Sequence, residues 1–145
     1  MKTIFLKTCL MTLVLSAFSL FSLTSCDKDD DTTPDVIKTK IVGTWDFTSF
    51  KVGNSEYIGV IVDSASVTFK AITGTQGDFE QTIVYTDGEQ DEISGKYTVD
   101  EAKKEVKMIA GGETEVVKIS FTSTDKMEWK STQDGKDVVA KTKRR

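Results

Sequence analysis

Apolar and polar residues alternate with a period of two along most of the chain after Ile41. Val117, Ile119 and Phe121, for example, are separated by single polar residues, and similar alternation runs through 66–70, 79–85, 92–99 and 127–130. Because successive side chains of a β-strand point to opposite faces, this period predicts strands with one apolar and one polar face. Such half-buried strands are typical of antiparallel sheets with one face in water.

Turn-forming residues separate these segments at short intervals. Gly, Asn and Asp tolerate the positive φ that tight hairpins need, and pairs such as Asp87-Gly88 and Gly111-Gly112 fall between alternating segments. We therefore predict nine strands, over 42–52, 56–62, 65–72, 78–86, 92–99, 104–110, 114–122, 126–132 and 137–143. The continuous apolar run in 56–62 can be either a buried strand or a short plug at one end.

The links between these segments decide the topology. No segment of ten or more residues has helical spacing, and the links are shorter than the roughly dozen residues that a parallel crossover needs. An antiparallel meander exposes its edge strands unless it closes or stacks, and successive short hairpins favour an up-and-down barrel over a Greek key. The pattern predicts an all-β domain over 41–145, an antiparallel up-and-down meander of eight to nine strands that closes into a barrel.

The N-terminal region has a different pattern. Lys2 and Lys7 precede an uncharged, largely apolar stretch that ends at Ser25, which is the form of a secretory signal. A retained transmembrane helix is the alternative, since about 18 uncharged residues can just span a bilayer. The interspersed Ser and Thr and the abrupt end before Cys26 favour a signal peptide over residues 1–25.

Leu23-Thr24-Ser25-Cys26 resembles the lipobox of bacterial lipoproteins, in which the Cys is acylated and becomes the new N-terminus. The resemblance implies that Cys26 is the lipidation site and that the protein is anchored to the cell outer membrane. Each buried acyl methylene contributes about 0.8 kcal/mol and one chain binds only reversibly, so stable anchoring needs a multiply acylated Cys.

Residues 26–40 are rich in Asp, Lys and Thr and contain the only proline, Pro34, so we expect a flexible tether after the lipidated Cys26. The acidic run Asp27-Lys28-Asp29-Asp30-Asp31 has two interpretations, which both predict an extended, charged segment. It is either a solvated spacer, or, as its resemblance to the export signal of surface-exposed Bacteroidetes lipoproteins implies, it directs the protein to the cell surface.

The composition of the chain argues against several classes of function. Without Lys2 and Lys7 the 19 basic residues fall to 17, against 23 acidic residues, so no basic stripe is available for nucleic acid. The basic tail 141–145 could lie on membrane headgroups or have no partner. Cys9 leaves with the signal and Cys26 carries lipid, so no disulfide is expected. The remaining length suits one domain, which we expect to be monomeric.

The chain contains no His and no free Cys after processing, which removes the usual hydrolytic triads and zinc sites. Carboxylates fall mostly in turns or at outward strand positions, where water keeps them ionised. The acidic loop 87–92 is the best candidate for a calcium site, but an acidic solvated turn is the preferred interpretation. We predict no enzyme activity, no cofactor and no metal.

Gly43-Thr44-Trp45 is similar to the Gly-x-Trp that begins lipocalins, and the span from about 41 to 143 looks like the lipocalin-like domains of Bacteroidetes lipoproteins. The resemblance implies that Trp45 closes the barrel floor against a basic residue near the chain end, for which the candidates are Lys141, Lys143 and Arg144. The chain departs from the lipocalin pattern in two ways. Tyr85-Thr86-Asp87 matches the Thr-Asp-Tyr turn only superficially, and no helix follows the last strand.

Large aromatic residues are expected to face inward. They form either a packed core or the lining of an apolar cavity for one small ligand, and the short strands favour a mostly filled core, although Ala65, Gly95 and Ala110 leave some room. The candidate lining residues are Trp45, Phe69, Phe79, Tyr85, Tyr97, Phe121 and Trp129. We predict a lipid-anchored envelope protein that binds a small hydrophobic ligand; the alternative is a non-enzymatic module that docks an envelope protein or a glycan.

Overall fold

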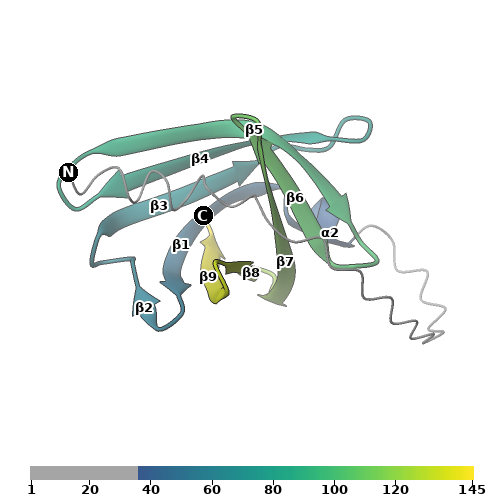
Figure 1. The fold of residues 1–145 in the computed structure, drawn as a ribbon. Coiled ribbons are helices and arrows are strands. Elements are labelled where there is room, and N and C mark those ends of the chain that lie inside the picture. The colour runs from purple at the N-terminus through teal and green to yellow at the C-terminus, as the bar shows by residue number, and fades with distance from the viewer. Residues whose placement is uncertain (1–35) are drawn as a thin grey trace.

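Nine antiparallel strands form one sheet that closes on itself. The computed structural model describes residues 36–145, and Figure 1 shows the strands curving around a common interior. Their order is β2-β1-β3-β4-β5-β6-β7-β8-β9, and β1 also pairs with β9. The strands are β1 (Gly43–Val52), β2 (Ser55–Glu56), β3 (Val62–Phe69), β4 (Gly77–Tyr85), β5 (Gln90–Asp100), β6 (Glu105–Ala110), β7 (Glu113–Ser123), β8 (Lys126–Gln133) and β9 (Lys136–Arg144). The prediction of an all-β meander closing into a barrel is confirmed: eight strands close, and β2 is a two-residue addition.

The prediction of a strand over 56–62 is wrong. Only Ser55–Glu56 pairs with β1, after which the carbonyl of Tyr57 accepts hydrogen bonds from the N–H groups of Val60, Ile61 and Val62 at 3.2, 3.1 and 3.0 Å. This compact turn contains Gly59 at a φ of 80°, a conformation that glycine adopts without strain. Val60 and Ile61 are 63% and 43% exposed, so the apolar run is not a buried strand.

The prediction that the tether extends to residue 40 is also wrong. Val36–Lys40 form a short helix, α2, and both Ile37 and Ile41 are buried in the main core. The carboxylate of Glu101, in the turn between β5 and β6, accepts the N–H groups of Ile37 and Lys38 at 3.0 and 2.7 Å. Burying these two apolar side chains supplies the free energy that a helix of this length lacks by itself. The predicted signal peptide, Cys26 and the rest of the tether lie outside the described residues.

Trp45 lies at the end of the barrel that α2 covers, which we call the closed end. Its side chain is fully buried, its Nε1 donates to the carbonyl of Ile41 at 2.7 Å, and the Arg144 guanidinium lies 4.4 Å from the indole ring centroid. Arg144 also donates to the carbonyls of Val42, at 2.8 Å, and Lys40. The basic residue expected to cover Trp45 is therefore Arg144, whereas Lys141 and Lys143 are exposed.

The same contact explains Gly43, the first residue of the Gly-x-Trp motif. Its φ is 129°, and a Cβ at this position would lie 2.9 Å from Nη1 of Arg144. Backbone conformation and lack of space both favour glycine, which lets the guanidinium reach the face of the indole ring. Residues from the two ends of the domain are joined here, which closes the barrel between β1 and β9.

The main core fills the closed end and the middle of the barrel. Gly95 shows how tightly this core is packed, because a Cβ at this position would lie 2.1 Å from the Ile109 carbonyl oxygen and 2.8 Å from the Phe79 ring. The opposite end, which we call the open end, is where β1 finishes and β3 begins, and a smaller cluster of Val62, Ile83 and Tyr85 lies there. Among residues 36–145, no helix has the length and apolar character needed to cross a bilayer.

Candidate functional site

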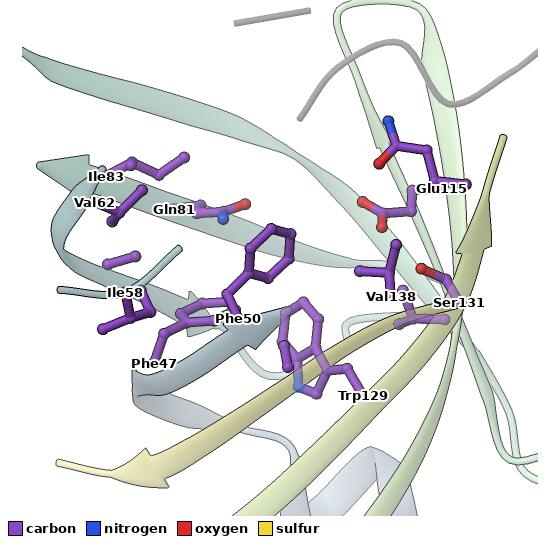
Figure 2. Close-up of a pocket in the computed structure, with 14 residues that line it drawn as sticks. Phe47, Phe50, Ile58, Val62, Gln81, Ile83, Glu115, Trp129, Ser131 and Val138 are labelled. Atoms are coloured by element: carbon purple, nitrogen blue, oxygen red, sulfur yellow. The ribbon is translucent and has the colours of Figure 1, made fainter. Parts of the chain in front are cut away.

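A cavity of about 50 Å³ lies inside the open end, and Figure 2 shows side chains from opposite walls pointing into it. Six strands, β1, β3, β4, β7, β8 and β9, and the turn after β2 contribute to the lining. The lining residues are Phe47, Phe50, Ile58, Val62, Ala65, Gln81, Ile83, Glu115, Val117, Trp129, Ser131, Gln133, Val138 and Ala140. Most of them are apolar, and the polar exceptions are confined to four side chains.

Phe47 and Phe50 form one wall although they are three residues apart on the same strand. Strict alternation would place residues 47 and 49 on one face, but the pairing of β1 with β9 shifts between Phe47 and Ser49. This irregularity turns Phe50 inward, where its ring centroid lies 6.5 Å from that of Phe47. Phe47 in turn packs edge to face on Trp129 at 5.3 Å.

The carboxylate of Glu56 holds the rim beside this wall. It accepts hydrogen bonds from the Ser49 hydroxyl at 2.6 Å and from the N–H groups of Phe50 at 2.7 Å, Ile58 at 3.1 Å and Tyr57 at 3.2 Å. Burial alone would raise the pKa of Glu56, but these four bonds stabilise the charged form and lower the pKa below its usual value. Glu56 thereby fixes the position of two lining residues, Phe50 and Ile58.

The four polar lining side chains are Gln81, Glu115, Ser131 and Gln133. Glu115 is partly buried, and burial raises the pKa of its carboxyl to about 7. Its carboxyl group has no hydrogen-bond or ion-pair partner among residues 36–145. Figure 2 shows the carboxylate of Glu115 directed into the cavity, with the amide of Gln81 extending from the opposite wall.

Glu115 departs from the expectation that carboxylates lie in turns or at outward strand positions. The period-two pattern of Val117, Ile119 and Phe121 continues backward to Glu115 and Glu113, which places both carboxylates on the inward face of β7. The signal was therefore present in the alternation, although the residue type argued against an inward position.

The structure distributes the seven aromatic candidates unequally. Only Trp129 lines the cavity. Five belong to or pack against the main core, with ring contacts such as Phe69 to Tyr97 at 4.9 Å and Trp45 to Phe121 at 5.9 Å. This group comprises Trp45, Phe69, Phe79, Tyr97 and Phe121. Tyr85 packs in the smaller cluster beside Val62 and Ile83, and its hydroxyl donates to Asp91 at 2.9 Å.

The carboxylates of the acidic loop 87–92 make local hydrogen bonds. Asp87 accepts the N–H of Glu89 at 3.1 Å, and Glu92 accepts the Gln90 amide at 2.9 Å. Within the part of the chain that the structure describes, no three His, Cys, Asp or Glu side chains gather in a way that could hold a metal ion. The loop geometry is that of an acidic turn held by its own backbone and side chains.

Comparisons with known proteins place this geometry in a family. The lipocalin-like domain family matches residues 41–129, which is more than half of the chain and includes both Trp45 and Glu115. Among curated proteins, none matches this chain in sequence.

Solved structures with the same fold include natural and designed barrels. A de novo designed fluorescence-activating β-barrel has a TM-score of 0.55 at 18% identity, covering 75% of this chain and 97% of the design. Japanin from Rhipicephalus appendiculatus, solved bound to cholesterol, has a TM-score of 0.55 at 10% identity, covering 71% of this chain and 74% of its own. Lobster apocrustacyanin A1 has a TM-score of 0.52 at 15% identity, and the match covers 79% of this chain and 64% of apocrustacyanin A1. At these identities the similarity concerns the fold.

Proposed function

The chain belongs to the lipocalin-like domain family, and from that premise we propose that its barrel binds a small, mainly apolar molecule in the cavity at the open end. The fold is typical of proteins that bind small hydrophobic ligands. The observation that carries the proposal is the lining of the cavity, which combines an apolar wall with four polar side chains. This combination is characteristic of small-molecule sites, where apolar burial supplies affinity and a few polar groups set orientation.

The cavity volume limits the size of the ligand. A water needs roughly 10–15 Å³ on the same measure, so about 50 Å³ accommodates a group of only a few heavy atoms. The packed core explains this limit, because Trp45, Phe69 and Tyr97 fill the rest of the barrel. The proposal is therefore binding of a small molecule or of one small end of a larger molecule, without catalysis.

A cavity-filling substitution tests this proposal. Ala65 lines the cavity, and Ala65→Leu places extra methyl groups in the space that a ligand would occupy. We expect an NMR titration with 1-butanol to shift the signals of Ile83, Trp129 and Val138 in the wild-type domain, and the affinity to fall at least about tenfold in Ala65→Leu. Ala102→Leu, at an exposed turn position, is the matched control and should bind as the wild type does. Equal binding by all three proteins would place the probe elsewhere and contradict the proposal.

We further propose that the barrel is held at the outer membrane by lipid on Cys26, with the acidic run after it directing the protein to the cell surface. The lipobox-like Leu23-Thr24-Ser25-Cys26 and the preceding apolar stretch support this proposal. Because α2 packs at the closed end, an anchor upstream of it attaches the barrel by that end. The mouth of the cavity would then face away from the membrane.

Substitution of Cys26 tests the anchor. Cys26→Ala should abolish incorporation of labelled palmitate and move the protein from the membrane fraction to the soluble fraction, because no acyl chain can be attached. Cys9→Ala is the matched control, since it removes the chain's other thiol from within the predicted signal peptide and should leave both readouts unchanged. Membrane retention of Cys26→Ala would contradict lipid anchoring at this residue.

A further inference from the structure

The barrel wall is incomplete beside the cavity. The ladder between β7 and β8 runs from Lys118 and Lys130 to Ser123 and Lys126, and it does not continue along the first half of β7. Residues 113–117 pair only with β6, and residues 131–133 pair only with β9. Extending the same register would place Glu115 opposite Gln133, so both side chains lie at the edges of this gap.

The cavity and a groove on the outer surface of the barrel share lining residues beside the gap. A groove on the outside is lined by residues on both sides of the gap, including Val116, Lys118, Lys130 and Thr132. Ser131 and Val138 contribute to the groove as well as to the cavity. Glu115 therefore lies beside a part of the wall whose residues line both the cavity and the outer groove.

Unpaired carboxylates mark this part of the wall. Glu115 has no partner among the described residues, and Oε2 of Glu113, two residues earlier on the same face, is buried without one. The cavity lining contains no Lys or Arg. The neighbouring lysines on the flanking strands, Lys107, Lys118 and Lys130, are exposed at outward positions. A buried carboxyl without a partner costs free energy, which a ligand group that donates hydrogen bonds would recover.

We propose that the cavity selects small molecules that carry a cationic amine on a short apolar body, with the amine bound by Glu115 at the gap between β7 and β8. The inference rests on the ligand-binding function proposed above and specifies its chemistry. The apolar part lies against Phe50, Ile83 and Val138, and the Gln81 amide faces the amine from the opposite wall.

The negative charge of Glu115 determines which ligand head group the cavity binds most tightly. An ammonium group donates charge-assisted hydrogen bonds to a carboxylate, and these are about twice as strong as neutral ones. Because burial raises the pKa of Glu115 to about 7, a bound cation shifts the carboxyl toward its ionised form, and amine binding is expected to be tightest above pH 7, where the carboxyl is already ionised. A ligand carboxylate would instead be repelled by Glu115 and Glu113. An alcohol can bind, but without the ionic contribution.

Three probes that each contain four carbon atoms separate these contributions: n-butylamine, 1-butanol and butyrate. Their dissociation constants are measured at pH 7.5 by NMR titration of the protein. We expect n-butylamine to bind about tenfold more tightly than 1-butanol, and butyrate to bind more weakly than either. In Glu115→Gln the affinity for n-butylamine should fall about tenfold, to that of 1-butanol, whose own affinity stays unchanged. Glu89→Gln, an exposed change of charge at the same end, should leave all three constants unchanged.

Titration results other than the expected one would each contradict a different part of the proposal. Equal affinities for n-butylamine and butyrate, or an amine preference that persists in Glu115→Gln, would overturn amine selection while 1-butanol binding still supports an apolar site. Binding of none of the three probes would overturn the proposed function together with the inference. Loss of 1-butanol binding in Glu115→Gln would show that Glu115 shapes the cavity and would overturn its assignment as an amine ligand.

Discussion

Replacing Trp45 with alanine is expected to lower the free energy of unfolding by about 3–5 kcal/mol, the range for removing a large buried aromatic side chain. Trp45 is fully buried, its Nε1 donates to the carbonyl of Ile41, and its ring contacts both Phe121 and the Arg144 guanidinium. The substitution leaves a cavity and also removes the surface that holds α2 and the end of β9 together. Urea unfolding followed by far-UV circular dichroism measures the change.

Two control variants separate the contributions at this end of the barrel. Trp45→Phe keeps an aromatic ring but loses the Nε1 hydrogen bond, so we expect a smaller loss than for alanine. Val116→Ala, which removes methyl groups from a half-exposed position on the outside of β7, should change the free energy of unfolding by no more than about 0.5 kcal/mol. A loss below about 1 kcal/mol for Trp45→Ala would contradict its role as the residue that closes the barrel.

The stability of the ligand-free domain is expected to fall as the pH rises from about 4.5 to 7 because of Glu115. Its pKa is about 7 in the folded protein, against an ordinary value of 4.5, so the folded state binds more protons than the unfolded state between these values. Stability then decreases with pH, and the decrease is complete about one unit above pH 7, where the carboxyl is ionised in both states. The difference corresponds to about 3 kcal/mol at 1.36 kcal/mol per pKa unit.

Glu115→Gln isolates this effect from the other titrating groups. Glu56 and Asp125 have lowered pKa values, so their contributions change in the opposite direction, being lost as the pH falls. The quantity to measure is therefore the difference in free energy of unfolding between Glu115→Gln and wild type from pH 4 to 8. We expect the variant to gain about 3 kcal/mol relative to wild type across this range. If the difference in free energy of unfolding does not change with pH, Glu115 remains solvated and ionised in the folded state.

Alternating apolar positions and hairpin signals were enough to predict the barrel. The nine predicted segments correspond to the nine observed strands to within a few residues, apart from the one at 56–62, because each strand has one face in water and thus a period of two. That segment failed because a continuous apolar run has no period, so it does not distinguish a strand from a turn whose side chains reach a neighbouring cavity. The helix at Val36–Lys40 was missed because it is too short to show helical spacing and depends on its contacts with the barrel.

The candidate site was much less predictable than the fold. The large aromatic residues were candidates for either a packed core or a cavity lining, with a mostly filled core favoured, and most of them do belong to the main core. The lining itself depends on residues with no distinctive local pattern. Phe50 faces inward only because of the irregularity between Phe47 and Ser49, which arises from pairing with β9. Glu115 lies on the inward face in the sequence pattern as well, but its residue type argued for solvent.

The amino-acid sequence alone thus determined the approximate strand positions, the Gly-x-Trp motif and the lack of histidine. These properties depend on residue identity and short-range spacing, which the sequence contains directly. The tertiary structure decided where the barrel stays open, because that depends on how far the β7 and β8 ladder extends and on which side chains fill the interior. Residues far apart in the chain, such as Gln81, Glu115 and Val138, share a cavity only after long-range pairing brings their strands together.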